Sequence, residues 1–129
     1  PVIAGQPDGV TDGFYTFAQF DTPNRVTCTP EICSWIDQYE AMFDTTPNIG
    51  SAYGYMYIDI TARALEIAGK DLTTDSFLKA LESIKDYKMP FGETILSWGP
   101  DKHLGANVAY LFEVQDGRFV QIDDKEYTY

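Results

Sequence analysis

The chain begins with an aromatic-rich run and then changes to helical spacing. Residues 13–20 (GFYTFAQF) lie between turn-forming Asp-Gly and Thr-Pro pairs, and they predict a β-strand. Over residues 30–43 the apolar side chains recur at i, i+3, i+4 and i+7, which predicts a helix with one buried face. Thr29 can cap this helix, and Pro30 suits its first position because the N–H that proline lacks would have no partner there.

Two further helices follow without a strand between them. The first is predicted from about residue 51 to residue 68 and ends at Gly69. The second is predicted to begin after Thr73 as its cap, with Asp75 placed favourably for the helix dipole. The apolar stripe expected for the first comprises Tyr53, Tyr57, Ile60, Ala64 and Ile67, and that of the second comprises Phe77, Leu78, Leu81 and Ile84.

The last third of the chain has the period of strands. Residues 93–98 (ETILSW) predict one strand, and residues 99–105 a loop. Asp116-Gly117 between residues 108–114 and 118–122 predicts a hairpin, because a type I′ turn needs positive φ at both central residues. The polar tail, residues 123–129, is expected to fray or to pack loosely.

The predicted order of elements is β-α-α-α-β-β-β, in the α/β class. Three successive helices need a sheet to cover, and the chain supplies few strands for one. We therefore expect residues 1–129 to form part of a larger α/β protein.

Composition narrows the classes of function. The chain has 129 residues, 44% of them hydrophobic, which is typical of a globular protein. Its formal net charge of −11 argues against nucleic acid or an anionic membrane as partner, because both need a basic face. Aromatic residues make up 15%, which is compatible with an aromatic-lined groove and also with aromatic side chains that simply fill strands and helix faces.

No constellation of residues predicts catalysis. The single histidine, His103, follows Asp101 by two residues, which raises an acid–base hypothesis, but its loop contains no nucleophile motif and a surface histidine is the better interpretation. Two cysteines and one distant histidine do not make a zinc site, and the acidic residues 123–126 lack the pattern of a calcium loop. We expect no enzyme, no metal and no cofactor.

The two cysteines are separated by four residues. If Thr29 caps the helix, Cys28 and Cys33 occupy the positions that touch in a hydrophobic staple. A disulfide at this place would contribute roughly 2 kcal/mol and would indicate an oxidising compartment. Two reduced cysteines that pack as small hydrophobic residues are the alternative. We favour the disulfide.

The order and spacing of several short motifs resemble one known family. They comprise the Tyr55 helix that ends in Ala68-Gly69, Leu72-Thr73, Ala80-Leu81-Glu82, the Asp101–Gly105 loop, Asp116-Gly117, and upstream DGVTDGFYTFAQF with WIDQYEAMFDTTPN. Together, over about residues 9–122, they resemble the solute-binding proteins of ABC transporters of the branched-chain amino acid type.

The resemblance implies a two-lobed type I periplasmic-binding-protein fold, of which residues 1–129 would be the C-terminal portion, with pieces of both lobes and hinge crossings. It implies an extracytoplasmic protein that captures a small amino acid-like, carboxylate or amide ligand by lobe closure and delivers it to a membrane permease. The remainder of the binding protein would be a further partner. A ligand-sensing domain of a receptor or regulator is the alternative. One family contact maps to residues 50–53, so Ser51 and Tyr53 are the candidate ligand-binding residues.

Overall fold

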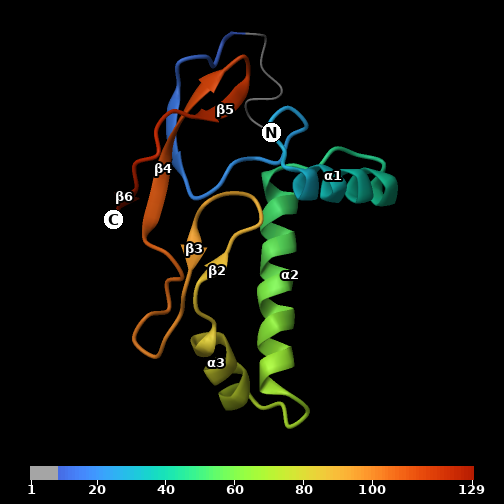
Figure 1. Cartoon of the computed structure of the whole chain (residues 1–129), viewed down its shortest axis with the longest axis vertical. Coiled ribbons are helices and arrows are strands. Elements are labelled where there is room, and N and C mark those ends of the chain that lie inside the picture. Colours follow the sequence, from blue (N-terminus) through green and yellow to red (C-terminus); the bar gives the residue numbers. More distant parts are fainter. Residues whose placement is uncertain (1–8) are drawn as a thin grey trace.

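The computed structural model describes residues 9–129, in which one strand is followed by three helices and then by five strands (Figure 1). The first eight residues of the expected segment 1–129 lie outside the described residues. Within the described part, no helix has the length and apolar character to cross a membrane. The elements are β1 (Tyr15–Ala18), α1 (Pro30–Phe43), α2 (Ile49–Ala68), α3 (Thr74–Ser83), β2 (Tyr87–Lys88), β3 (Ile95–Leu96), β4 (Val108–Gln115), β5 (Arg118–Gln121) and β6 (Tyr127–Thr128).

The main sheet is built around β4, which pairs antiparallel with β1, β5 and β6. The β4–β5 hairpin confirms the Asp-Gly prediction, since Asp116 has φ 52° and Gly117 has φ 71°. The expectation of a frayed tail is wrong, because β6 pairs with the start of β4. The hydroxyl of Tyr127 also donates to the carboxylate of Asp123 at 3.0 Å, a local contact between two tail residues.

At the start of each helix, a capping side chain accepts a hydrogen bond from a backbone N–H that has no partner within the helix. The Thr29 hydroxyl accepts from the Ile32 N–H at 3.4 Å, so α1 begins as predicted. α2 begins two residues earlier than predicted, because Asn48 caps it and accepts from the N–H of Gly50 at 2.8 Å. Thr73 caps α3 as predicted, with Ser76 completing a capping box.

The buried row of α2 contains Ile60 and Ala64 as predicted, but its first half runs through other residues than Tyr53 and Tyr57. Its buried residues are Ala52, Met56, Ile60 and Ala64. Tyr57 is 58% exposed and Ile67 is 56% exposed, so the large side chains of the predicted stripe flank the contact with the rest of the protein. α3 approaches the helix closely, and buried Ala64 on α2 and Ala80 on α3 leave room for that approach. On α3, likewise, Leu78 is 49% exposed whereas Ala80 is buried.

The predicted strand over residues 93–98 is shorter than expected. Only Ile95–Leu96 forms β3, and it pairs with β2, which the sequence pattern did not indicate. Beyond β3 the backbone leaves the ladder: the N–H of Ser97 donates to the carbonyl of Gly105, and that of Trp98 donates to the carbonyl of Ile84. The backbone N–H groups that a longer β3 would direct to β2 therefore donate to carbonyls elsewhere in the fold.

Two segments run side by side between the main sheet and the helices. The N–H of Asp21 donates to the carbonyl of Phe91 at 3.2 Å, and the Thr94 hydroxyl donates to the carbonyl of Gln19. Gly92 lies directly against Phe20 at this crossing. In Figure 1, α2 follows the long axis of the molecule, with the main sheet beside its start and α3 beside its end.

Cys28 and Cys33 form the predicted disulfide across the start of α1. Their Cα atoms are 5.4 Å apart. A second clamp lies nearby, where the guanidinium of Arg25 pairs with Asp37 at 2.8 Å and with Glu40 at 2.6 Å. The segment before α1 is thus tied to the helix at two places.

Candidate functional site

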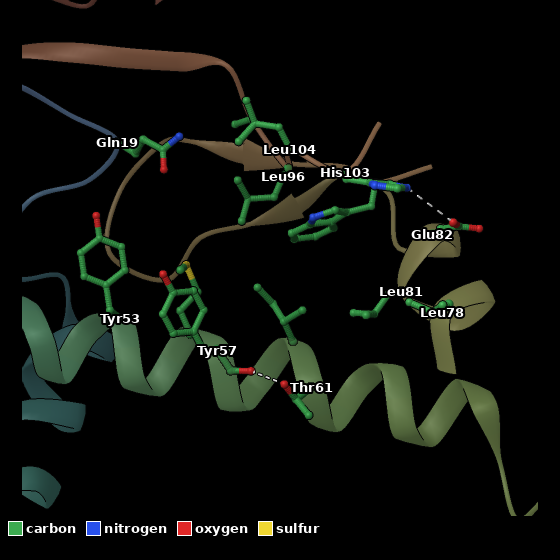
Figure 2. Close-up of a pocket in the computed structure, with 15 residues that line it drawn as sticks. Gln19, Tyr53, Tyr57, Thr61, Leu78, Leu81, Glu82, Leu96, His103 and Leu104 are labelled. Atoms are coloured by element: carbon green, nitrogen blue, oxygen red, sulfur yellow. Dashed lines mark hydrogen bonds and ion pairs between the residues drawn. The ribbon is translucent and has the colours of Figure 1, made fainter. Parts of the chain in front are cut away.

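The larger of two cavities that concern function is a groove between α2, α3 and the loop after β3, with a volume of about 610 Å³ (Figure 2). We call it the helix groove. It is lined by Gln19, Tyr53, Met56, Tyr57, Ile60, Thr61, Leu78, Leu81, Glu82, Leu96, Trp98, His103, Leu104, Gly105 and Ala106. The walls are mainly aliphatic and aromatic, so the groove favours apolar contacts over polar recognition.

The polar groups of the helix groove offer no catalytic arrangement. The hydroxyl of Thr61 donates to the Tyr57 carbonyl at 2.7 Å and is thereby used within α2. His103 is 81% exposed, and its Nε2 lies 4.0 Å from the carboxylate of Glu82. This exposure agrees with the interpretation of His103 as a surface residue. Within the described part of the chain, no three metal-ligating side chains come together.

A close approach shapes one end of the groove. A Cβ added at Gly105 would lie 2.7 Å from the Cζ2 atom of the Trp98 ring. Only glycine lets the loop backbone lie flat against this indole. The loop that carries His103 and Leu104 is therefore held over α2 by contact with Trp98.

The second cavity lies between the main sheet and the start of α2, and its volume is about 220 Å³. We call it the sheet–helix cavity. It is lined by Thr16, Phe17, Ala18, Phe20, Thr22, Ile49, Tyr53, Phe112 and Phe119. Thr16 stands directly opposite Phe112 in the β1–β4 register, so these strands form one wall. Ile49 and Tyr53, one turn apart on α2, belong to the other wall.

Tyr53 is the one residue that lines both cavities. Its ring meets that of Phe20 edge to face, with 4.7 Å between centroids. The Tyr53 phenol is protonated at neutral pH and can donate a hydrogen bond, and burial raises its pKa further above its ordinary value. Of the two residues predicted to contact a ligand, Tyr53 therefore faces space that a ligand could fill.

Ser51 lines neither cavity. Its hydroxyl accepts from the N–H of Asn48 at 3.3 Å as part of the α2 capping box. The same hydroxyl donates to the hydroxyl of Tyr39 at 2.9 Å, which links α2 to α1. These contacts give Ser51 a structural task, and its role toward a ligand stays a prediction.

Several lining residues were not predicted. Phe20, Phe112 and Phe119 come from three separated parts of the chain, and only the pairing of β1, β4 and β5 brings them to one place. Alternation along each strand could have indicated which side chains share a face, but no local signal predicts which face borders α2.

The chain was compared with known protein families and solved structures. A family model described as periplasmic binding protein matches residues 1–118. A branched-chain amino acid ABC transporter protein from Thermus thermophilus, solved with bound valine, superposes with a TM-score of 0.74 at 18% identity, over 92% of this chain and 34% of that chain. No curated protein sequence matches the chain.

Two other similar structures come from Rhodopseudomonas palustris. A solute-binding protein of an ABC transporter from strain BisB5, in complex with 3,4-dihydroxybenzoic acid, has a TM-score of 0.71 at 18% identity and covers 98% of this chain and 34% of that chain. An extracellular ligand-binding receptor from strain HaA2 has a TM-score of 0.64 at 19% identity, over 87% of this chain and 34% of that chain. The chain thus spans about a third of the length of these structures.

These findings confirm the resemblance and the fold class expected from the sequence. The family model covers well over half of the chain, and the chain superposes on the solved structures with TM-scores of 0.74 and 0.71. The chain therefore belongs to the periplasmic binding protein family, and its fold matches part of the two-lobed type I fold.

Proposed function

We propose that this chain belongs to the solute-binding component of an ABC importer, which works outside the cytoplasm and carries no catalytic activity. The protein captures a small amino acid-like or carboxylate ligand by closing its two lobes, and it delivers the ligand to a membrane permease. The observation that carries this proposal is the family match over residues 1–118. Similar structures that contain valine and 3,4-dihydroxybenzoic acid support a small-molecule ligand. The Cys28–Cys33 disulfide supports an oxidising compartment.

The ligand, in this proposal, lies against the start of α2, where the main sheet and the helices face each other. Tyr53 is its principal contact from this chain, because it lines the sheet–helix cavity. Ser51 acts through the Tyr39–Ser51 contact, which holds the start of α2 in place. Closure would bring the two sides of this region together over the ligand.

The exposed apolar surface supports a further part of the proposal. Leu78, Leu104 and Tyr57 line the helix groove and are 49%, 55% and 58% exposed. Large contiguous apolar surfaces of this kind are uncommon on a monomeric protein surface and mark places where other protein packs. We propose that the remainder of the binding protein packs here, so that the segment 1–129 carries pieces of both lobes and the crossings between them. The helix groove is then interior to one lobe and is not the ligand site.

The proposal is tested on the full-length protein by ligand binding. Isothermal titration with small amino acids and carboxylates should find a ligand that also raises the unfolding temperature, since a ligand bound by the native state stabilises it. Small-angle X-ray scattering should show a smaller radius of gyration in the bound state. If no compound of these classes binds, the proposed function is wrong.

A matched pair of variants locates the site. Tyr53→Ala should weaken binding about tenfold or more, because buried aromatic contacts rank among the strongest in binding sites. Tyr57→Ala removes the same side chain one turn along α2, where it lines the helix groove and stacks on Tyr53 with 5.8 Å between ring centroids, so it should weaken affinity much less than Tyr53→Ala does. Equal loss in both variants would contradict the placement of the ligand.

A ligand-sensing domain of a receptor or regulator is the second candidate function. The similar structure described as an extracellular ligand-binding receptor favours it. The two functions differ in the partner: an importer component should stimulate ATP hydrolysis by its permease in membranes, whereas a sensor should not.

A further inference from the structure

The sheet–helix cavity has a composition that points to a class of ligand. Five of its nine lining residues are aromatic. Four of them, Phe20, Tyr53, Phe112 and Phe119, direct their rings to the cavity side, whereas the ring of Phe17 packs against Tyr127 on the other face of the sheet. This is a larger aromatic share than that of the helix groove, where Tyr53, Tyr57, Trp98 and His103 stand among many aliphatic side chains. The cavity therefore offers ring edges and faces to its occupant.

The rings of the cavity are held in place by the fold. Phe112 is 2% exposed and Phe20 is 3% exposed, so neither can turn away from the cavity without disturbing the core. Phe20 already meets Tyr53 edge to face at 4.7 Å. Aromatic pairs prefer this geometry, and a third ring that enters beside them can adopt it without rearrangement of the wall.

The charges around the cavity exclude one kind of occupant. None of the lining residues that the structure describes is charged, and the polar groups among their side chains are the hydroxyls of Thr16, Thr22 and Tyr53. An ammonium group or a carboxylate buried here would lose its hydration without gaining a partner of opposite charge. An occupant with an uncharged ring and its charge outside the cavity avoids that cost.

The size of the cavity fits a single ring. An apolar cavity of about 150 Å³ in another protein binds benzene. The sheet–helix cavity measures about 220 Å³, which leaves room for one six-membered ring and a small substituent.

We propose that the sheet–helix cavity binds the ring of a monocyclic aromatic carboxylate, with the carboxylate directed out of the cavity. This inference rests on the proposed function and adds the chemical class of the ligand. It ranks aromatic acids above branched-chain amino acids, because only the former place an uncharged ring among the four aromatic rings that face the cavity.

The test compares three probes on the full-length protein by isothermal titration: benzoate, cyclohexanecarboxylate and L-leucine. Cyclohexanecarboxylate matches benzoate in charge and closely in size but has no aromatic ring. We expect benzoate to bind at least tenfold more tightly than either of the others. Binding of L-leucine without binding of benzoate would overturn the inference and leave the proposed function intact. Equal affinity for benzoate and cyclohexanecarboxylate would also overturn it. If no amino acid or carboxylate binds, both proposals fail.

Variants of the cavity wall provide the second arm. Ala18→Leu places a larger side chain in the cavity and should weaken benzoate binding at least tenfold, while Ala41→Leu on the exposed face of α1 serves as the matched control. Phe119→Leu, at a half-buried position, removes one ring and keeps an apolar side chain, so it should reduce the preference for benzoate over cyclohexanecarboxylate even if Ala18→Leu fails to fold. Unchanged benzoate affinity in a folded Ala18→Leu protein would overturn the inference.

Discussion

Gly92 offers a sharp test of how the two crossing segments fit together. A Cβ added at this position would lie 2.9 Å from the Cβ of Phe20 and 3.1 Å from its Cα. The first distance is below any ordinary carbon–carbon contact, and the second involves the backbone, so a rotation of the Phe20 side chain cannot relieve the clash. Gly92→Ala must therefore push the two segments apart.

The cost follows from what holds these segments. Moving Phe20 disturbs its packing against Tyr53 and strains the hydrogen bond from the Asp21 N–H to the Phe91 carbonyl. Overpacking of this kind typically costs about 1–3 kcal/mol, and we expect Gly92→Ala to lower the free energy of unfolding by about that amount. Because Phe20 also lines the sheet–helix cavity, the affinity for the ligand should fall as well.

Gly54→Ala is the matched control. Gly54 lies inside α2, and an added Cβ there would meet nothing within 4 Å. The same substitution should therefore raise the free energy of unfolding by about 0.5–1 kcal/mol, because glycine is the poorer helix former. Urea unfolding followed by circular dichroism, with linear extrapolation, measures both variants on the full-length protein. The reasoning is refuted if Gly92→Ala is as stable as the unsubstituted protein.

Three other predictions concern the disulfide, a buried tyrosine and the lone histidine. Replacing Cys28 and Cys33 together by serine should lower the free energy of unfolding by about 2 kcal/mol in urea, and an unchanged midpoint would contradict a stabilising bond. Burial, and the 2.8 Å hydrogen bond that its hydroxyl donates to Asp59, raise the pKa of Tyr87 above 10.0. This contribution to stability is complete below the unfolded-state pKa and is lost as pH rises toward the folded-state pKa. Urea midpoints between pH 9 and pH 11 should therefore fall less steeply in Tyr87→Phe than in the unsubstituted protein. Parallel curves for the two proteins would contradict this prediction. His103→Ala should leave the ligand affinity, measured by titration calorimetry, unchanged. A tenfold loss of affinity would indicate that His103 contacts the ligand.

Local chemistry determined where the helices begin and where the hairpin turns. Thr29 and Thr73 each precede an amphipathic run and cap the helix that it forms, because their hydroxyls accept hydrogen bonds from free N–H groups within the same turn. Asp116-Gly117 closes β4 on β5 for an equally local reason, the positive φ that both residues adopt. The Cys28–Cys33 pair also belongs to this class, since a helix cap alone brings the two residues together.

Tertiary structure decided which faces are buried and where a ligand can lie. The sequence pattern placed Tyr57 on the buried face of α2, but the buried row instead contains Ala52 and Met56. α3 packs against the same helix, where the small side chains of Ala64 and Ala80 permit a close approach. β6 likewise depends on distant partners, since it pairs with the start of β4 and its Tyr127 packs against Phe17. The sheet–helix cavity joins strands and a helix that are far apart in the chain. A stripe of apolar residues specifies that a face will be buried, but only the partner elements specify which one.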